Sequence, residues 1–370
     1  MTQQSQQASA RQRTRSPRKR LRILLTAIIA ALALVAASLF AASILFKGDP
    51  DYVGSGKGEV LITVSEGESA CGGIDTDLES QGVVKSAKTF CNYVLEQSPE
   101  PVFQIGTFRL AKQMSASAAL AALLDPKNKV ELSVTIIEGS FAEDAFKKIS
   151  DVTKIPLDQF EQAAIDYTSY GVPASAPSIE GFLFPATYVF EPGQTAQQII
   201  QIMVDRMMQA LDEHGVPVEQ RLEIVTMASI IQREAGSNPD DFYKVSRVFW
   251  NRLSGEACPT SLLQSDATVS YGTGNTHTVW TQESERKDGE NLYNTYLHEG
   301  LPIGPIGLPG DLAIDAALHP TDGPWCFFVP VNLKTGETHF SVTQDEHDAA
   351  ANELAKWCTA SRARGENYCD

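Results

Sequence analysis

The residue with the clearest chemical potential in this chain is Glu234, in the last turn of a helix predicted over residues 222–236. Apolar or small side chains recur in this segment with helical spacing, which predicts a buried amphipathic helix. They are Ile224, Met227, Ala228, Ile230, Ile231 and Ala235. Gly236 follows the last of them, where a helix C-cap favours glycine. Glu234 should therefore project from the apolar face.

Burial and the negative end of the helix dipole would both disfavour an ionised Glu234 carboxylate. A glutamic acid that stays protonated near neutral pH is what a general acid for cleavage of a glycosidic bond requires. The alternative is a solvated helix end, formed by Gln232, Arg233 and Glu234, in which the glutamate pairs with an arginine. The helical spacing alone favours this alternative, so the assignment depends on the rest of the chain.

Charge is distributed unevenly along the 370 residues. Residues 1–22 contain seven basic and no acidic residues, whereas the rest of the chain contains 23 basic and 46 acidic ones. Because an acidic surface repels nucleic acid, we exclude nucleic acid as a partner.

An uncharged, mostly apolar run over residues 23–46 follows the basic segment. As a helix, its 24 residues would extend about 36 Å, against about 30 Å for the hydrocarbon core of a bilayer. We predict an uncleaved single-pass anchor in the plasma membrane with residues 1–22 in the cytoplasm, because basic residues favour that side. A cleaved signal peptide is the alternative, but the run is long and no polar segment precedes a cleavage site.

The chain after the apolar run is predicted to be extracytoplasmic, with a linker over 47–57, a small module over 58–137 and a larger domain over 138–370. The module reads as strand, helix, helix, strand. This order resembles the LysM module, which binds glycans, although a structural spacer has the same pattern. A further strand is predicted over 129–137, at the end of the module. The larger domain mixes predicted helices with a polar loop over 273–291 and a β-hairpin over 325–342. The predicted fold class is therefore α+β throughout.

All six cysteines lie after the apolar run, which suggests disulfides on the outer side of a membrane. Six cysteines allow about 15 pairings. Proximity in sequence favours Cys71–Cys91, Cys258–Cys326 and Cys358–Cys369. The chain has no Cys-x-x-Cys pair, and we predict neither zinc, nor another metal, nor a cofactor.

Short motifs follow the Glu234 helix in series: RVFWNRL (247–253), LQSDATV (263–269), YNTY (293–296), GLP (300–302), IGPI (303–306) and ALHP (317–320). Together with the segments 179–190 and MASIIQRE (227–234), they resemble the MltG (YceG-like) endolytic murein transglycosylases. The resemblance covers most of residues 58–350. It departs at Ser265 and Ala267, where Thr and Pro are expected, and at Phe182, where Tyr or Trp is usual.

The resemblance implies a membrane-anchored enzyme that cuts peptidoglycan glycan strands internally and leaves 1,6-anhydroMurNAc ends, terminating nascent strands. Glu234 occupies the position of the family's catalytic acid. That acid protonates the oxygen between MurNAc and GlcNAc and then, as a base, takes the proton of the C6 hydroxyl. One carboxyl group suffices, whereas most glycoside hydrolases use two, about 5 to 9 Å apart. The implied partners are peptidoglycan strands and the membrane synthases that make them.

Seven further residues are candidates for binding the substrate: Glu180, Tyr188, Asn251, Gln264, Asp266, Asn294 and Tyr296. Either acid could supply a second carboxylate. Glu180, which precedes Gly181 at a turn, could equally be a cap or a solvated charge. Asp266 could polarise the substrate or Glu234, or could cap a helix beginning at Ala267. The amides and aromatic rings could bind sugar hydroxyls and stack on a ring, or could anchor loops. We expect His319 and His339 to satisfy backbone groups rather than bind metal.

Two other functions stay open: a muramidase that hydrolyses the same bond, and a non-catalytic glycan-binding scaffold for wall synthases. Acyl transfer is disfavoured. SERK (284–287) and KTG (334–336) fit the S-x-x-K and K-T-G motifs of penicillin-binding enzymes. However, Ser284 lies in a polar stretch without an apolar helix to bury it, and no S-D-N motif lies between the two.

Overall fold

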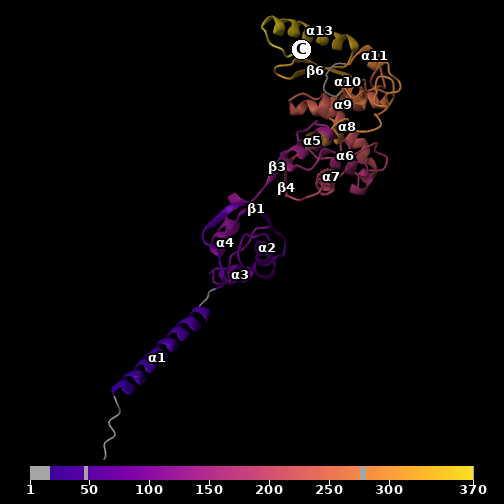
Figure 1. Cartoon of the computed structure of the whole chain (residues 1–370). Helices are drawn as coiled ribbons and strands as arrows, with labels where there is room; N and C mark the ends of the chain where they lie inside the picture. The colour runs from indigo at the N-terminus through magenta and orange to yellow at the C-terminus, as the bar shows by residue number, and fades with distance from the viewer. Residues whose placement is uncertain (1–16, 46–48, 276–280, 370) are drawn as a thin grey trace, which may run out of the picture. The chain divides into compact units, whose positions relative to one another are not determined.

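A computed structural model describes residues 17–45, 49–275 and 281–369, and only the backbone for 17–24 and 41–45 (Figure 1). These residues form two compact units, one ending at Val130 and one beginning at Glu131. We describe each unit by itself.

The first element is a long helix, α1 (Pro17–Leu45). It contains most of the predicted membrane segment 23–46, of which residue 46 and the side chains of 23–24 and 41–45 lie outside what the structure describes. Between 25 and 40 every side chain is exposed, including eight large apolar ones: Leu25, Ile28, Ile29, Leu32, Leu34, Val35, Leu39 and Phe40. Among the described residues, no helix is long and apolar enough to cross a bilayer.

The rest of the first unit is built on two antiparallel strands, β1 (Ser55–Val64) and β2 (Gly106–Met114). Between them lie η1 (Ala70–Ile74), α2 (Asp75–Ser80) and α3 (Ala87–Leu95), and after β2 come α4 (Ala116–Leu124) and η2 (Pro126–Asn128). The core contains Ile62, Phe90 and Phe108. The expected strand–helix–helix–strand order is present. The predicted linker is too long, because β1 begins at Ser55 in a glycine-rich stretch that lacks the alternation typical of strands.

The second unit is organised around α8 (Arg221–Glu234). All eight residues from 224 to 231 are buried, so the helix is enclosed on every side rather than on the one face that the sequence predicted. It packs against α9 (Pro239–Ser254), α10 (Asp266–Gly272) and α12 (Asp311–Leu318). This enclosure fixes the position of the residue at its C-terminal end.

The chain before α8 supplies the other side of this core. The strands β3 (Leu132–Thr135) and β4 (Thr187–Phe190) pair in antiparallel fashion. Between and after them come α5 (Ala142–Thr153), α6 (Leu157–Ala164), η3 (Tyr167–Tyr170), α7 (Ala196–Glu213) and η4 (Val218–Gln220). A capping box at Thr195 and Gln198 begins α7, because each side chain satisfies the backbone N–H of the other residue.

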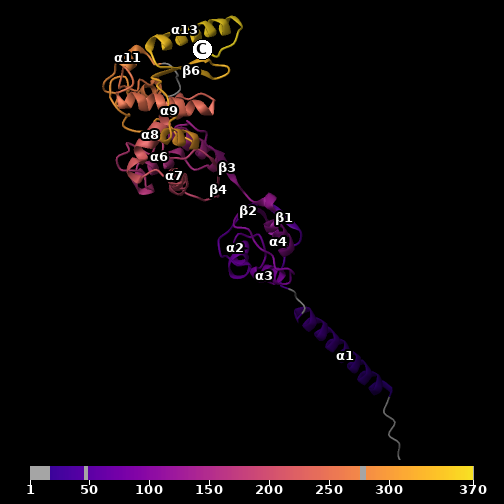
Figure 2. The ribbon, with the colours of Figure 1, turned by 180° about the vertical axis from the view of Figure 1, so that it is seen from behind.

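The C-terminal part is a β-hairpin of β5 (Phe327–Asn332) and β6 (Glu337–Ser341), covered by α13 (Gln344–Ala363). Both views place α13 over this hairpin (Figures 1 and 2). The predicted polar loop over 273–291 contains a short helix, α11 (Glu283–Arg286), while its residues 276–280 lie outside the described part. The three expected disulfides, Cys71–Cys91, Cys258–Cys326 and Cys358–Cys369, are all present.

Candidate active site

Glu234 is the last residue of α8. The helix ends because Ala235 adopts an extended conformation, with φ −70° and ψ 139°, while its N–H still donates to the Ile231 carbonyl. The expected glycine cap at Gly236 is therefore wrong, since the cap is an extended alanine and Gly236 is not left-handed. The extended exit leaves the Glu234 side chain at the end of the helix, facing the residues that follow.

Glu234 lines a pocket of about 340 Å³ between the end of α8 and the β5–β6 hairpin. This volume is in the range of pockets that bind small molecules or single sugar units. The other lining residues are Gly236, Ser237, Phe328, Pro330, Leu333, Lys334, Gly336 and Thr338. The acid is thus partly buried but can reach a ligand in the pocket.

A second pocket, of about 260 Å³, lies in the first unit beside β1 and β2. Its two charged residues pair with each other, with Arg109 Nε 2.8 Å from Glu59 Oε1. It therefore contains no buried acid of the kind that proton transfer requires, and we place the chemistry at Glu234.

Ser265 fixes one oxygen of Glu234. Its hydroxyl donates to Glu234 Oε1 at 2.5 Å and also accepts the Thr268 N–H at the start of α10. The sequence-based alternative that Asp266 caps this helix is wrong: Ser265 is the extended N-cap residue, and Asp266 is the first residue of α10. A single hydroxyl therefore connects the acid to the helix that begins with Asp266.

The environment favours the protonated form of Glu234. Burial raises the pKa of its carboxyl above the usual range, and the negative charge of Asp266 raises it further. The Ser265 hydroxyl, the Ala267 N–H and the charge of Arg233 act in the opposite direction without cancelling the increase. The guanidinium of Arg233 lies over the Phe141 ring, 4.9 Å from its centroid. The shift is thus in the direction that a general acid needs.

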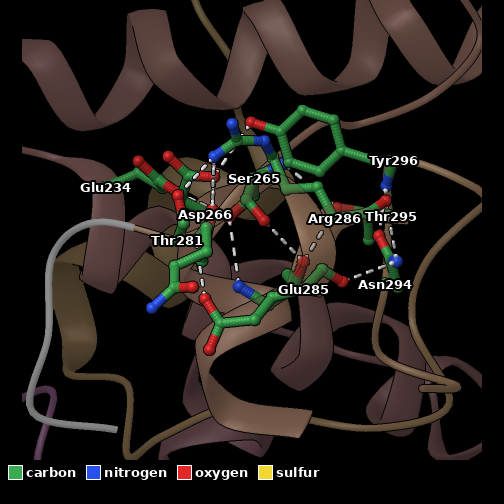
Figure 3. A network of polar contacts seen from close by, with 11 residues as sticks. Glu234, Ser265, Asp266, Thr281, Glu285, Arg286, Asn294, Thr295 and Tyr296 are labelled. Atoms are coloured by element: carbon green, nitrogen blue, oxygen red, sulfur yellow. Dashed lines mark hydrogen bonds and ion pairs between the residues drawn. The ribbon is translucent and has the colours of Figure 1, made fainter. Parts of the chain in front are cut away.

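Asp266 is held by two hydrogen-bond donors and one ion pair (Figure 3). Its Oδ1 accepts hydrogen bonds from the hydroxyls of Thr281 and of Tyr296, the latter at 3.0 Å. Arg286 Nη1 lies 3.8 Å from the same oxygen, and its guanidinium lies 5.7 Å from the centre of the Tyr296 ring. Asp266 therefore acts on Glu234 through its negative charge. The Tyr296 hydroxyl is used to hold Asp266.

Thr295 holds the turn that presents Ser265. Its carbonyl accepts the Gln264 N–H and its hydroxyl accepts the Ser265 N–H, both at 3.0 Å. The same hydroxyl is 2.8 Å from that of Thr268. Gln264 has a φ of +52°, a conformation that is uncommon outside glycine and is often found at functional sites. We did not predict a role for Thr295; its place between Asn294 and Tyr296 in one motif was the available signal.

Two of the predicted substrate-binding residues support loops. The Asn294 amide donates to the carbonyls of Glu285, Arg286 and Asp288, and its oxygen accepts the Tyr296 N–H. Asn294 has no exposed surface, so it positions Arg286 and Tyr296 from beneath. The Asn251 amide donates to the carbonyls of Gly323 and Trp325, which fits the loop-anchor alternative.

Two more of the predicted substrate-binding residues, Tyr188 and Glu180, lie in the core of the second unit. The Tyr188 hydroxyl donates to the Phe184 carbonyl at 2.6 Å. The Glu180 carboxylate accepts the Ala142 N–H at the start of α5, at 3.1 and 3.2 Å, and the Tyr271 hydroxyl at 3.3 Å. Glu180 therefore caps the start of α5, which fits the cap alternative, and with 6% exposure it is not a solvated charge.

The histidine expectation needs a correction at one position. The ring of His319 lies 3.1 Å from the Asp315 carboxylate, one helical turn before it, rather than on a backbone group. His339 lies exposed on β6.

Comparisons with known proteins identify the family of this chain. The YceG-like family model matches residues 62–353. An endolytic murein transglycosylase of Bacillus subtilis is 30% identical over 319 residues, which cover 80% of this chain and 84% of that protein. One from Streptococcus pneumoniae is 26% identical over 331 residues, covering 78% of this chain and 57% of that protein. A YceG-like protein of Listeria monocytogenes, known from a crystal structure, superposes with a TM-score of 0.51 at 28% identity, covering 79% of this chain and 99% of that one. Because the family model spans well over half of the residues and reaches across both units, this chain belongs to the YceG-like family.

Proposed function

We propose that this protein is an endolytic murein transglycosylase that cuts peptidoglycan strands between MurNAc and GlcNAc and leaves 1,6-anhydroMurNAc ends. The observation that carries this proposal is one glutamic acid, Glu234, that lines a pocket and whose pKa is raised by burial. It stands where the family places its catalytic acid. The names of the relatives from Bacillus subtilis and Streptococcus pneumoniae support the same assignment.

In the first step Glu234 gives its proton to the oxygen that joins the two sugars. The bond from MurNAc C1 to this oxygen breaks, its electron pair stays on the oxygen, and C1 acquires oxocarbenium character. The upward shift in the pKa of Glu234 favours the protonated form, which this step requires. The Ser265 hydroxyl keeps the carboxyl group in one orientation while the proton leaves.

In the second step the Glu234 carboxylate takes the proton of the C6 hydroxyl of the same MurNAc. The C6 oxygen then bonds to C1 and closes the 1,6-anhydro ring, which restores the protonated acid without consuming water. Both steps use one carboxyl group. Asp266, whose Oδ1 is engaged by Thr281, Tyr296 and Arg286, serves as a fixed negative charge rather than as a nucleophile.

The products of digestion test this reaction. Full-length protein in detergent is incubated with purified glycan strands, and the new ends are measured by mass spectrometry. We expect ends lighter by one water than reducing ends, and these products should disappear with Glu234→Gln. Reducing ends alone would assign a muramidase. A Glu234→Gln protein that retains its cellular role, with no products from wild type, would assign a scaffold.

We also propose a single-pass plasma-membrane anchor with the enzyme outside the cell. Support comes from the uncharged run 23–46, from the basic residues before it and from the exposed apolar side chains of α1. Protease added to intact spheroplasts should digest the second unit and spare an N-terminal epitope tag. Release of the whole protein by alkaline carbonate would contradict the anchor.

We further propose that the part of the first unit after α1 is a LysM-like glycan-binding module, because its elements follow the order strand, helix, helix, strand. The proposed cellular role is to terminate nascent strands beside the synthases that make them. If so, strands should lengthen in cells that carry Glu234→Gln, and crosslinking in intact cells should capture a synthase. Unchanged strand lengths would argue against this role.

A further inference from the structure

The pocket that contains Glu234 also contains a cation. Lys334, in the turn between β5 and β6, lines it together with the acid. Its side chain is 58% exposed and is therefore accessible to a ligand. Apart from the acid, the other lining side chains are apolar or uncharged. A lysine in such a pocket is a recognition element for an anion on the ligand.

The position of this lysine relative to Glu234 is fixed by the turn itself. Asn332 Oδ1 accepts the backbone N–H groups of Lys334 and Thr335, at 3.1 and 3.2 Å. Gly336 has a φ of +74°, and a Cβ on it would lie 2.7 Å from Ser237 Oγ. The turn is therefore packed closely on the segment that follows the acid, and only glycine fits at the contact.

Glu366 is the acidic partner of Lys334 among the described residues, and it holds the lysine weakly. Within the described residues, its Nζ lies 3.7 Å from Glu366 Oε1, too far for a hydrogen bond. The other oxygen of Glu366 is taken by Arg364 Nη2 at 2.8 Å and by Ser361 Oγ at 3.2 Å. The Cys358–Cys369 disulfide closes the loop that carries this glutamate. A ligand carboxylate could displace Glu366 from Lys334 while Glu366 keeps its other partners.

We propose that Lys334 selects glycan strands whose stem peptides carry free carboxylates, and that Glu366 is the intramolecular group such a carboxylate replaces. This inference rests on the proposed function and specifies its substrate. The lactyl group of MurNAc places the stem peptide beside the sugar that reacts at Glu234. The peptide's carboxylates are therefore the anions nearest to the bond being cleaved. Amidation of those carboxylates removes the charge that Lys334 pairs with.

The test compares two substrates that differ only in charge. Uncrosslinked strands with intact stem peptides are digested before and after their carboxylates are converted to amides with a carbodiimide and ammonia. For full-length wild-type protein we expect KM to rise about threefold to tenfold on the amidated strands, with kcat nearly unchanged. Lys334→Met should show the higher KM on both substrates, whereas Lys334→Arg should discriminate between them like wild type.

Two further variants sharpen this test. Glu366→Gln should lower KM on the carboxylated strands only, because it removes the competing charge. Lys356→Met, on the exposed face of α13, removes the same charge away from the pocket and should behave like wild type. Equal KM values for wild type on both substrates, or wild-type discrimination by Lys334→Met, would overturn the proposal. Absence of anhydro products from wild type would instead defeat the proposed function. Dissociation constants measured with Glu234→Gln protein give the same comparison without turnover.

Discussion

Two glutamates of the second unit, Glu180 and Glu234, both have a pKa raised chiefly by burial, yet they lie at opposite kinds of helix end. Glu180 accepts the first N–H of α5, at the positive end of a helix dipole, and this contact lowers its pKa. Glu234 is the last residue of α8, at the negative end. Glu180 is closed off in the core, whereas Glu234 lines a pocket.

The comparison separates two properties that are easily confused. A raised pKa reports that a carboxyl group has lost water, and both residues have lost it. Catalysis also requires that a substrate oxygen can approach within hydrogen-bonding distance, and only the pocket beside Glu234 provides that approach. The buried acid in the core serves the fold, and the buried acid in the pocket serves the reaction.

The largest expected effect is on activity. Glu234→Gln keeps the size of the side chain but removes the proton it donates, so kcat/KM for strand cleavage should fall about a hundredfold to ten-thousandfold. Glu180→Gln, the matched change in the core, should leave kcat/KM close to wild type at pH 6, where Glu180 is already largely protonated. Release of anhydro ends from defined strands measures both. Comparable losses of kcat/KM in the two variants would contradict the assignment of catalysis to Glu234 alone.

The second expected effect is on stability. Burial raises the pKa of Glu180 to about 7, whereas an unfolded glutamate titrates near 4.3. Because the folded-state value is the higher one, the stability that this residue contributes is complete below about pH 4 and is lost as the pH rises through 7. The loss is on the order of 4 kcal/mol, since each pKa unit corresponds to about 1.4 kcal/mol. Glu180→Gln cannot titrate and should lack this loss.

The difference in unfolding free energy between wild type and Glu180→Gln should therefore shrink, or change sign, between pH 4 and pH 8. Urea unfolding followed by tryptophan fluorescence measures it, because all four tryptophans lie after residue 130 and report on the second unit. The titration of Glu234 occurs in both proteins and cancels in the difference. If this difference in unfolding free energy stays constant across the pH range, folding does not raise the pKa of Glu180.

The elements that place Glu234 could be predicted from sequence because their signals are local. The apolar spacing of 222–236 predicted α8, the pattern over 325–342 predicted the hairpin, and cysteine proximity predicted all three disulfides. Complete burial of α8 was not predictable from its own residues, since it depends on α9, α10 and α12 packing around it. The predicted glycine cap was wrong because Ala235 ends the helix one residue earlier.

The surroundings of the acid were harder to predict, because their contacts join residues that are distant in sequence. Asn294 was chosen for its polar type, yet long-range packing buries it completely beneath the loop it supports. Thr281 and Arg286 lie in a segment predicted as a surface loop. They join the site through a hydrogen bond and an ion pair with Asp266, which is distant in sequence. Ser265, noted only as a departure from the usual threonine, is the residue that touches the acid.

The smallest expected effect concerns that contact. Ser265→Ala removes a hydrogen bond that favours the ionised form of Glu234, so the pKa of Glu234 should rise further. The basic limb of the kcat/KM profile, where the acid loses its proton, should then move to higher pH. Loss of the N-cap of α10 should also cost about 1 kcal/mol of stability.

Ser265→Thr is the control, because it keeps the hydroxyl and restores the residue expected at this position in the family. It should retain the wild-type pH profile and the cap of α10. A purely structural role for Ser265 would lower the stability of the alanine variant without moving its basic limb, whereas a role in tuning the acid moves the limb even at temperatures where both variants are fully folded. The pH profile thus decides whether the Ser265 hydroxyl, between α8 and α10, tunes the pKa of Glu234 or only caps a helix. If it tunes the pKa, Glu234 differs from Glu180 in its hydrogen-bonding environment as well as in its access to substrate.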